Sequence, residues 1–152
     1  MEIGTFKLGG NLERYFGFLS SQQALDPILD VHAVTFRSAI TIARDIYLEE
    51  AGLVPQLAVL QAKLYRLRLL TEHITQHTPG MHTLVWVYFI AAASSRDVAD
   101  RQYFTGKLRE VHANSRMKNI LVALVVLEDI WSKYPDGGWV RNVGSIHSVL
   151  VM

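Results

Sequence analysis

The segment LVWVYFIAAASS at residues 84–95 carries the clearest information about fold class. Its valines and aromatic residues also suit a strand, but the alanines near its end favour a helix, and no other segment is an evident partner strand. The uncharged apolar run from Leu84 to Ala93 has ten residues, whereas a membrane span needs about 20. We therefore predict a buried central helix over 81–95 and no membrane association.

Two further helices are predicted before this segment. Asp26-Pro27 is a typical helix start and Gly52 a typical stop, which predicts a helix over 26–51 with a narrow polar stripe. A second helix is predicted from Pro55 to about His77, where leucines recur at spacings of three, four and seven. Such spacing is typical of an amphipathic helix on the protein surface, and Thr78-Pro79-Gly80 ends it.

Two more helices are predicted after the central segment, over 95–112 and 117–134. The sequence Pro135-Asp136-Gly137-Gly138 then favours a turn, and Trp139 is expected to anchor the tail on the helices. The predicted fold is all-α, a single bundle of about five helices with a central buried helix. We expect one domain over 1–152, in which 1–25 and 135–152 are the ends outside the main helices.

Composition excludes several classes of protein. The 152 residues are half hydrophobic, and 15 Lys and Arg minus 14 Asp and Glu leave a net charge of +1. This excludes a disordered chain and a basic nucleic-acid-binding surface. The absence of cysteine removes disulfides, thiolate catalysis and zinc fingers, and it fits an intracellular protein. The stretch MEIGTFKLGGNLERYFGFL at 1–19 lacks a signal-peptide pattern, so none is expected.

Histidines are the candidate metal ligands. His73 and His77 are four residues apart and share one face of the predicted 55–77 helix, and His82 follows the turn. Three imidazoles can hold zinc or another divalent metal. Histidine at a helix end also complements the helix dipole and the last carbonyls. We favour this second role, and expect neither a metal nor a cofactor.

Other polar and aromatic residues allow both a functional and a structural interpretation. His32, near Asp30 and Arg37 in the sequence, can act as a general base or satisfy a hydrogen bond in the core. The remaining sets are possible anion ligands, pocket-lining aromatic residues and partner-binding cations. They are Arg96, Arg101 and Tyr103; Trp86, Tyr88, Phe89 and Trp131; and Lys63, Arg66 and Arg68. The structural alternatives are a solvated face for the charged sets and a packed core for the aromatic set.

Four phrases together resemble one family. They are FRSAITIARDIYLEE at 36–50, PGMHTLVWVYFIAAASS at 79–95, DRQYFTGKLREV at 100–111 and KNILVALVVLEDIW at 118–131. Their order is similar to the C-terminal part of the regulatory, or middle homology, domain of fungal zinc-binuclear-cluster transcription factors, in the acriflavine-sensitivity-control-like group. The resemblance covers about residues 25 to 135. Its motifs are helix-packing residues, so they indicate fold more than activity.

The resemblance implies an all-helical domain that regulates a DNA-binding module and senses small molecules. This chain lacks the cysteines of the zinc cluster, so we do not expect it to bind DNA directly. It is either an excised domain or a free-standing one. We expect it to bind a small hydrophobic metabolite or a partner chain. A homodimer is possible, and we expect it to form through an apolar helix face. The expected location is intracellular, nuclear if the chain is part of a regulator and cytoplasmic otherwise.

An enzyme on the same scaffold is the alternative hypothesis. A helical bundle with an aromatic pocket can hold a secondary metabolite for isomerisation, cyclisation or dehydration, because these reactions need a shaped cavity and one or two acid/base groups. The candidate catalytic residues are His32, Asp30, Arg37, Arg44, His82 and Tyr88.

Overall fold

Five α-helices and two short 3-10 helices make up the regular structure of residues 30–142, the part of the chain that the computed structural model describes. No strand occurs in this part of the chain, so the all-α prediction is confirmed. The elements in chain order are α2 (Asp30–Ala51), α3 (Leu57–Thr71), η2 (Met81–Leu84), α4 (Val85–Ser94), α5 (Val98–Ser115), α6 (Lys118–Lys133) and η3 (Val140–Asn142).

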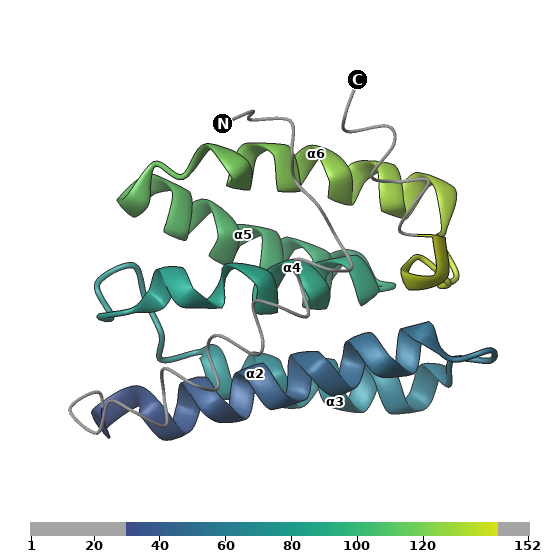
Figure 1. Cartoon of the computed structure of the whole chain (residues 1–152), viewed down its shortest axis with the longest axis horizontal. Helices are drawn as coiled ribbons and strands as arrows, with labels where there is room; N and C mark the ends of the chain where they lie inside the picture. Colours follow the sequence, from purple (N-terminus) through teal and green to yellow (C-terminus); the bar gives the residue numbers. More distant parts are fainter. Residues whose placement is uncertain (1–29, 143–152) are drawn as a thin grey trace.

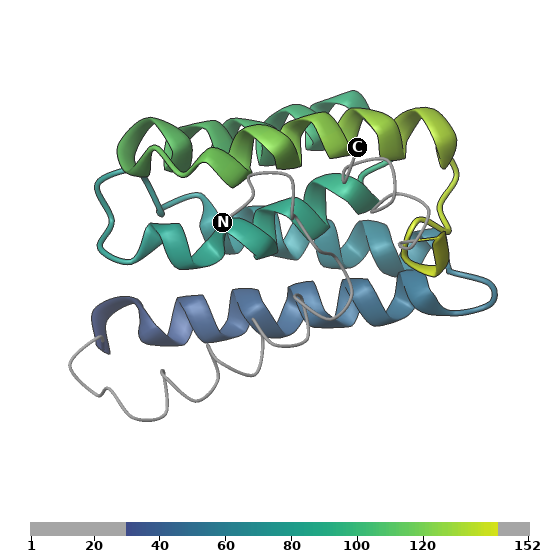
Figure 2. The ribbon, with the colours of Figure 1, turned by 45° about the horizontal axis from the view of Figure 1, so that its top comes forward.

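Helix α4 is the central helix, as predicted. Consecutive helices alternate in direction, with α2 and α3 on one side of α4 and α5 and α6 on the other (Figures 1 and 2). Every residue of α4 except Trp86 is buried. A helix that is apolar on all sides can only be stable when other helices cover it all round.

Helix α2 has the narrow polar stripe that the sequence predicts. Arg37, Thr41 and Arg44 are exposed, whereas Ala39, Ala43 and the isoleucines between them are buried. The helix ends at Ala51, directly before Gly52, as expected. Its predicted start at Asp26-Pro27 lies outside the described residues.

The predicted extent of the second helix is wrong at its end. Helix α3 stops at Thr71, six residues before His77. Ile74 is buried and lies in a turn that follows the helix, where its amide donates to the Thr71 carbonyl at 3.0 Å. The side chain of Lys107 on α5 donates to the Ile74 carbonyl. Burial of Ile74 and this contact with a distant helix favour a turn over a continued helix.

Two smaller differences also come from local hydrogen bonding. The predicted helix over 81–95 begins with a 3-10 turn, after Gly80 adopts a φ of 83° that favours glycine. The helix predicted over 95–112 is α5, which starts later because Asp97 caps it by accepting from the Asp100 amide at 2.7 Å. It extends to Ser115, and Arg116 is the residue that caps its carboxyl end. Helix α6 matches the prediction for 117–134 to within one residue at each end.

Trp139 packs against α2 and α4. This residue follows the predicted turn and is fully buried, so its predicted role as an anchor is confirmed. Its indole Nε1 donates to Ser94 Oγ at 3.1 Å, and its ring lies edge-on to Tyr47 and Phe89. The residues beyond Asn142 lie outside the described part of the chain.

Candidate functional site

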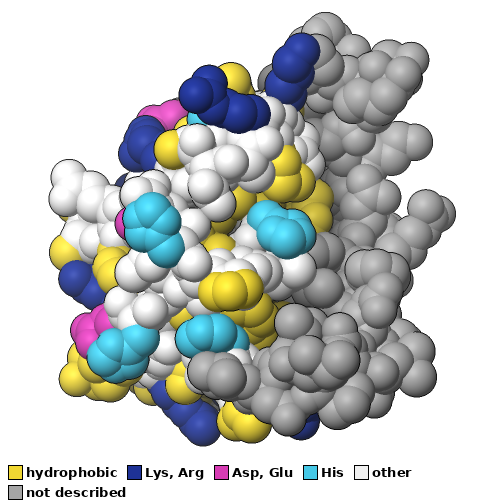
Figure 3. All heavy atoms as spheres, turned by 90° about the vertical axis from the view of Figure 1, so that its left-hand side faces the viewer, with side chains coloured by type: hydrophobic (Ala, Val, Ile, Leu, Met, Phe, Trp, Pro, Cys, Tyr) yellow, Lys and Arg dark blue, Asp and Glu magenta, His cyan; other side chains and the backbone are white. Residues whose placement is uncertain are grey.

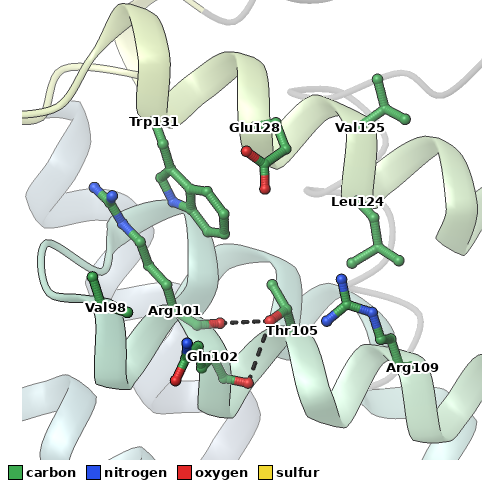
Figure 4. A pocket seen from close by; sticks show the side chains of 9 residues that line it. All are labelled: Val98, Arg101, Gln102, Thr105, Arg109, Leu124, Val125, Glu128 and Trp131. Carbon is green, nitrogen blue, oxygen red and sulfur yellow. Dashed lines mark hydrogen bonds between the residues drawn. The ribbon is translucent and has the colours of Figure 1, made fainter.

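An open groove of about 540 Å³ runs between α5 and α6. Figure 4 shows side chains from both helices converging on it. The carboxyl half of α6 supplies one wall, and the first three turns of α5 supply the other. The lining residues are Val98, Arg101, Gln102, Thr105, Arg109, Leu124, Val125, Glu128 and Trp131.

The apolar part of the groove is unusually exposed. Val98 on α5 and Val125 on α6 are each 65% exposed, and Leu124 and Trp131 are half-buried beside them. Leu121, one turn before Val125 on α6, is also exposed. Isolated exposed apolar side chains are ordinary, but a contiguous set on two neighbouring helices is typical of an interaction surface.

Trp131 and Arg101 form the rigid end of the groove. The Trp131 indole Nε1 donates to the carbonyl of Ala92 on the central helix at 2.9 Å. The Arg101 guanidinium lies 4.9 Å from the centre of the Trp131 ring, and its Nε donates to the Ser95 carbonyl at 3.0 Å. Burial, together with the nearby charge of Arg96, lowers the pKa of Arg101 below its usual range. A guanidinium that is stacked and bonded in this way presents a preorganised charge.

Opposite charges line the rest of the groove. Arg109 on α5 and Glu128 on α6 are exposed, and within the described residues neither makes an ion pair or side-chain hydrogen bond. Thr105, which lies between Arg101 and Arg109 in Figure 4, has its hydroxyl occupied by the Arg101 and Gln102 carbonyls at 2.7 and 3.3 Å. The groove therefore offers an apolar strip with one free cation and one free anion, an arrangement suited to recognition.

The predicted aromatic pocket is mostly core. Tyr88 and Phe89 are fully buried, and Phe89 is packed edge-on between Trp86 and Trp139, with ring centroids 5.7 and 6.0 Å away. Of the four aromatic residues proposed from the sequence, Trp131 alone lines the α5–α6 groove. The packed-core alternative is therefore correct for the other three.

A buried polar cluster joins α3, α4 and α5. Tyr103 bonds to Thr71 at 3.0 Å through their hydroxyls, and the ammonium of Lys107 lies 5.5 Å from the Tyr103 ring centre. Burial raises the pKa of Tyr103 and lowers the pKa of Lys107. The hydroxyl of Tyr88 is buried without a hydrogen-bond partner among the described residues, and burial raises its pKa strongly. The bond between Thr71 and Tyr103 joins α3 to α5, so the role of this cluster in the fold is packing and positioning.

The candidate acid/base residues are dispersed. His32 is half-buried and stacks on Phe36 at 6.0 Å, Arg37 and Arg44 are exposed on α2, and His82 is exposed in η2. Asp30 is the first residue of α2, and its side chain lies outside the description. Among His32, Arg37, Arg44, His82 and Tyr88, no hydrogen bond or ion pair joins any two.

Histidines do gather at one end of the bundle, but not as the sequence suggests. His73 and His77 follow the end of α3 in turns, so the shared helical face behind the metal prediction does not exist. They and His82 are exposed. Figure 3 shows several separate imidazoles at the end where α2 and α4 begin. Within the described residues, no group of three or more His, Asp or Glu side chains is placed to hold a metal ion.

The proposed anion ligands are engaged in structural contacts. Arg96 pairs with the buried Glu50 through two bonds of 3.1 and 3.2 Å, while Arg101 stacks on Trp131 and Tyr103 binds Thr71. Among the predicted partner-binding cations, Arg68 binds Asp100 at 3.1 Å. Burial and the charge of Asp97 raise the pKa of that carboxyl, and the Arg68 bond opposes the shift. Lys63 lies 3.9 Å from Asp45, whereas Arg66 is exposed and unpaired.

Sequence reasoning missed most of the α5–α6 groove. Of its residues, Arg101 and Trp131 were candidates, but Val98, Arg109, Val125 and Glu128 were not. The available signal was weak: Leu121 and Val125 fall on the outer face of a helix that already has a complete inner face. An apolar residue on the outer face of a helix can be assigned to a second contact surface only when the position of the neighbouring helix is known.

Comparison with known proteins gives one match. The model of a family described as the fungal specific transcription factor domain matches residues 17–147, which is most of the chain. No curated protein and no solved structure matches the chain. Nowhere in residues 30–142 is there a helix with the length and apolarity that a bilayer crossing requires.

Proposed function

The chain belongs to the fungal specific transcription factor domain family, and from that premise we propose that it regulates transcription by holding a partner protein segment in the α5–α6 groove. The family resemblance expected from the helix-packing motifs is thereby confirmed, and with it a regulatory role. The partner, the nuclear location and the absence of direct DNA binding are parts of the proposal.

One observation carries the choice of a protein partner. Val98 and Val125 are each 65% exposed on the two sides of the same groove. A metabolite is usually held in a cavity that covers most of its surface, whereas this groove is open along two helices. A helical or extended segment laid along it would cover both valines and Leu124 together, in the manner of a helix-in-groove complex.

The charges of the groove would fix the orientation of the segment. Arg109 would bind an acidic side chain and Glu128 a basic one. Arg101, stacked on the Trp131 ring, would bind a carboxylate or carbonyl at the rigid end. Paired charges at the edge of an interface contribute more to specificity than to affinity. The apolar strip would supply most of the affinity.

Direct DNA binding and catalysis have no comparable support. The net charge of +1 and the free glutamate in the groove disfavour a phosphate backbone as the partner. The five described acid/base candidates make no hydrogen bond or ion pair with one another, so no feature favours isomerisation, cyclisation or dehydration.

The test is a reporter assay in a fungal host. The full chain is fused to a heterologous DNA-binding module, and reporter output is compared for Val98→Glu with Val125→Glu and for the control Val54→Glu, an exposed valine between α2 and α3 that lies outside the groove. The groove variant is expected to lose most of the regulatory effect, whereas the control keeps it. The two variants should have equal melting temperatures. Equal output from both variants would disprove the groove as the regulatory surface.

A further inference from the structure

Three arginines on the opposite side of the bundle have no partner. Arg37 and Arg44 are exposed on α2, and Arg66 is exposed on α3. Within the described residues none of the three side chains makes an ion pair or hydrogen bond. Arg37 and Arg66 line the same shallow groove of about 280 Å³ between α2 and α3. The one carboxylate in that groove, Asp45, already faces Lys63 at 3.9 Å.

Exposed apolar side chains flank these arginines. On α2, Val34 and Leu48 are 67% and 59% exposed and flank the two arginines. Residues 34, 37, 41, 44 and 48 share one helix face because of the 3.6-residue period. On α3, Leu69 is 45% exposed, and it lies one turn from Arg66 on the same face. We call these six residues the arginine face: Val34, Arg37, Arg44, Leu48, Arg66 and Leu69.

We propose that the arginine face binds an acidic amphipathic helix from another protein. The unpaired cations would bind carboxylates, and the apolar side chains beside them would pack against a complementary apolar stripe. From Val34 to Leu48 is about 21 Å of helix at a rise of about 1.5 Å per residue, so the segment would be about 15 residues long. The surface is separate from the α5–α6 groove and does not depend on the function proposed for it.

Other occupants fit less well. In a symmetric dimer of two copies through this face, arginines would meet arginines, because such an interface brings the same patch together. A phosphate group is usually held by backbone amides at a helix start or by a tight cluster of cations. Here the arginines lie within helices, with valine and leucine beside them. A nucleic acid would also meet the carboxylate of Asp45 and gain little from the apolar side chains.

The test uses a fluorescein-labelled synthetic peptide of about 15 residues, with leucines on one helical face and glutamates elsewhere. Binding to the full chain is followed by fluorescence anisotropy. The double variant Arg37→Glu with Arg66→Glu is expected to weaken binding by about tenfold or more, since it reverses two contacts. The matched control Lys118→Glu reverses an exposed cation at the start of α6, outside both this face and the α5–α6 groove, and is expected to bind as the parent does.

Three results would overturn the proposal. The first is equal binding of a peptide with lysines in place of the glutamates. The second is an equal loss in the Lys118→Glu control. The third is binding of phosphatidylserine vesicles or a random DNA duplex that is as tight as peptide binding and depends equally on Arg37 and Arg66. Such binding would make the face a general polyanion surface. Thermal melts of the variants should match the parent, because the substituted side chains are exposed and unpaired.

Discussion

The two ends of the bundle hold together in different ways. One end, the ion-pair end, contains Glu50, Ser94, Arg96 and Trp139, which come from the carboxyl ends of α2 and α4 and from the segments before α5 and after α6. The other, the histidine end, contains His32, His73, His77, His82 and His112, at the start of α2, after α3, before α4 and at the end of α5. Alternating helix directions bring these element ends together at the left of Figure 1.

At the ion-pair end, buried polar groups far apart in the sequence bind one another. The Glu50 side chain has no exposed surface and accepts two bonds from Arg96, whose Nη1 also donates to the Ser94 carbonyl at 2.7 Å. Gly137 has a φ of 107°, and a Cβ there would lie 2.4 Å from the Arg96 guanidinium. The chain therefore passes the ion pair closely at a position where only glycine fits.

At the histidine end the contacts are mostly local. Thr78 Oγ1 accepts from the Thr75 amide at 2.9 Å, and Thr83 Oγ1 donates to the Gly80 carbonyl at 2.7 Å. The bond from Lys107 to the Ile74 carbonyl is the long-range exception. The difference implies that side-chain changes at the ion-pair end act on the whole fold, whereas those at the histidine end act on a turn.

The largest effect is expected from Arg96→Met. It leaves the Glu50 carboxylate buried without its partner, which typically costs about 3–5 kcal/mol. Arg68→Met is the matched control, because the Arg68–Asp100 pair has the same 3.1 Å distance but an arginine that is 38% exposed. We expect the control to lose about 1 kcal/mol or less. Urea denaturation measures both, and equal losses would contradict the contrast between buried and exposed pairs.

A smaller effect, of opposite sign, is expected from Tyr88→Phe between the two ends. It removes a buried hydroxyl without a partner, which should stabilise the fold by about 1–2 kcal/mol at pH 7. Burial raises the pKa of Tyr88, so the folded state keeps the phenol protonated at pH values where the unfolded chain ionises it. The parent protein therefore keeps its full stability below the unfolded pKa of about 10 and loses stability as the pH rises further.

Denaturant midpoints measured from pH 7 to above pH 10 would check the Tyr88 prediction. Tyr88→Phe should lose stability less steeply than the parent in the alkaline range. Tyr103 and Lys107 titrate in both proteins, so the difference between the two curves isolates Tyr88. A variant less stable than the parent at pH 7 would mean that the hydroxyl is satisfied in solution.

The smallest effect is expected at the histidine end. Replacing His73, His77 and His82 together by alanine should change the free energy of unfolding by about 0.5 kcal/mol or less, because all three side chains are exposed. We also expect added zinc to leave the melting temperature unchanged. A zinc-dependent rise that the triple variant lacks would instead support the metal site that the histidine spacing suggested.

The sequence alone predicted the elements and their order well. Its apolar period identified four of the five α-helices within a few residues at their described ends, and it identified the buried centre around Tyr88 and Phe89. The error at His77 has a definite cause: the amphipathic pattern continues through Ile74, but Ile74 is buried from a turn, fixed by a lysine 33 residues away. The periodic pattern shows which residues are apolar, but it does not show whether a helix or a turn carries them.

What the sequence determined is therefore the all-α class and the central helix, because these follow from local pattern and composition. The family came from the resemblance of four phrases of the sequence. Tertiary structure decided the pairing of Glu50 with Arg96, the groove between Val98 and Val125, and the meeting of Arg37 with Arg66 on two helices. Each of these depends on the relative position and rotation of helices that are distant in the sequence. Those are set by how side chains from the whole core fill space together.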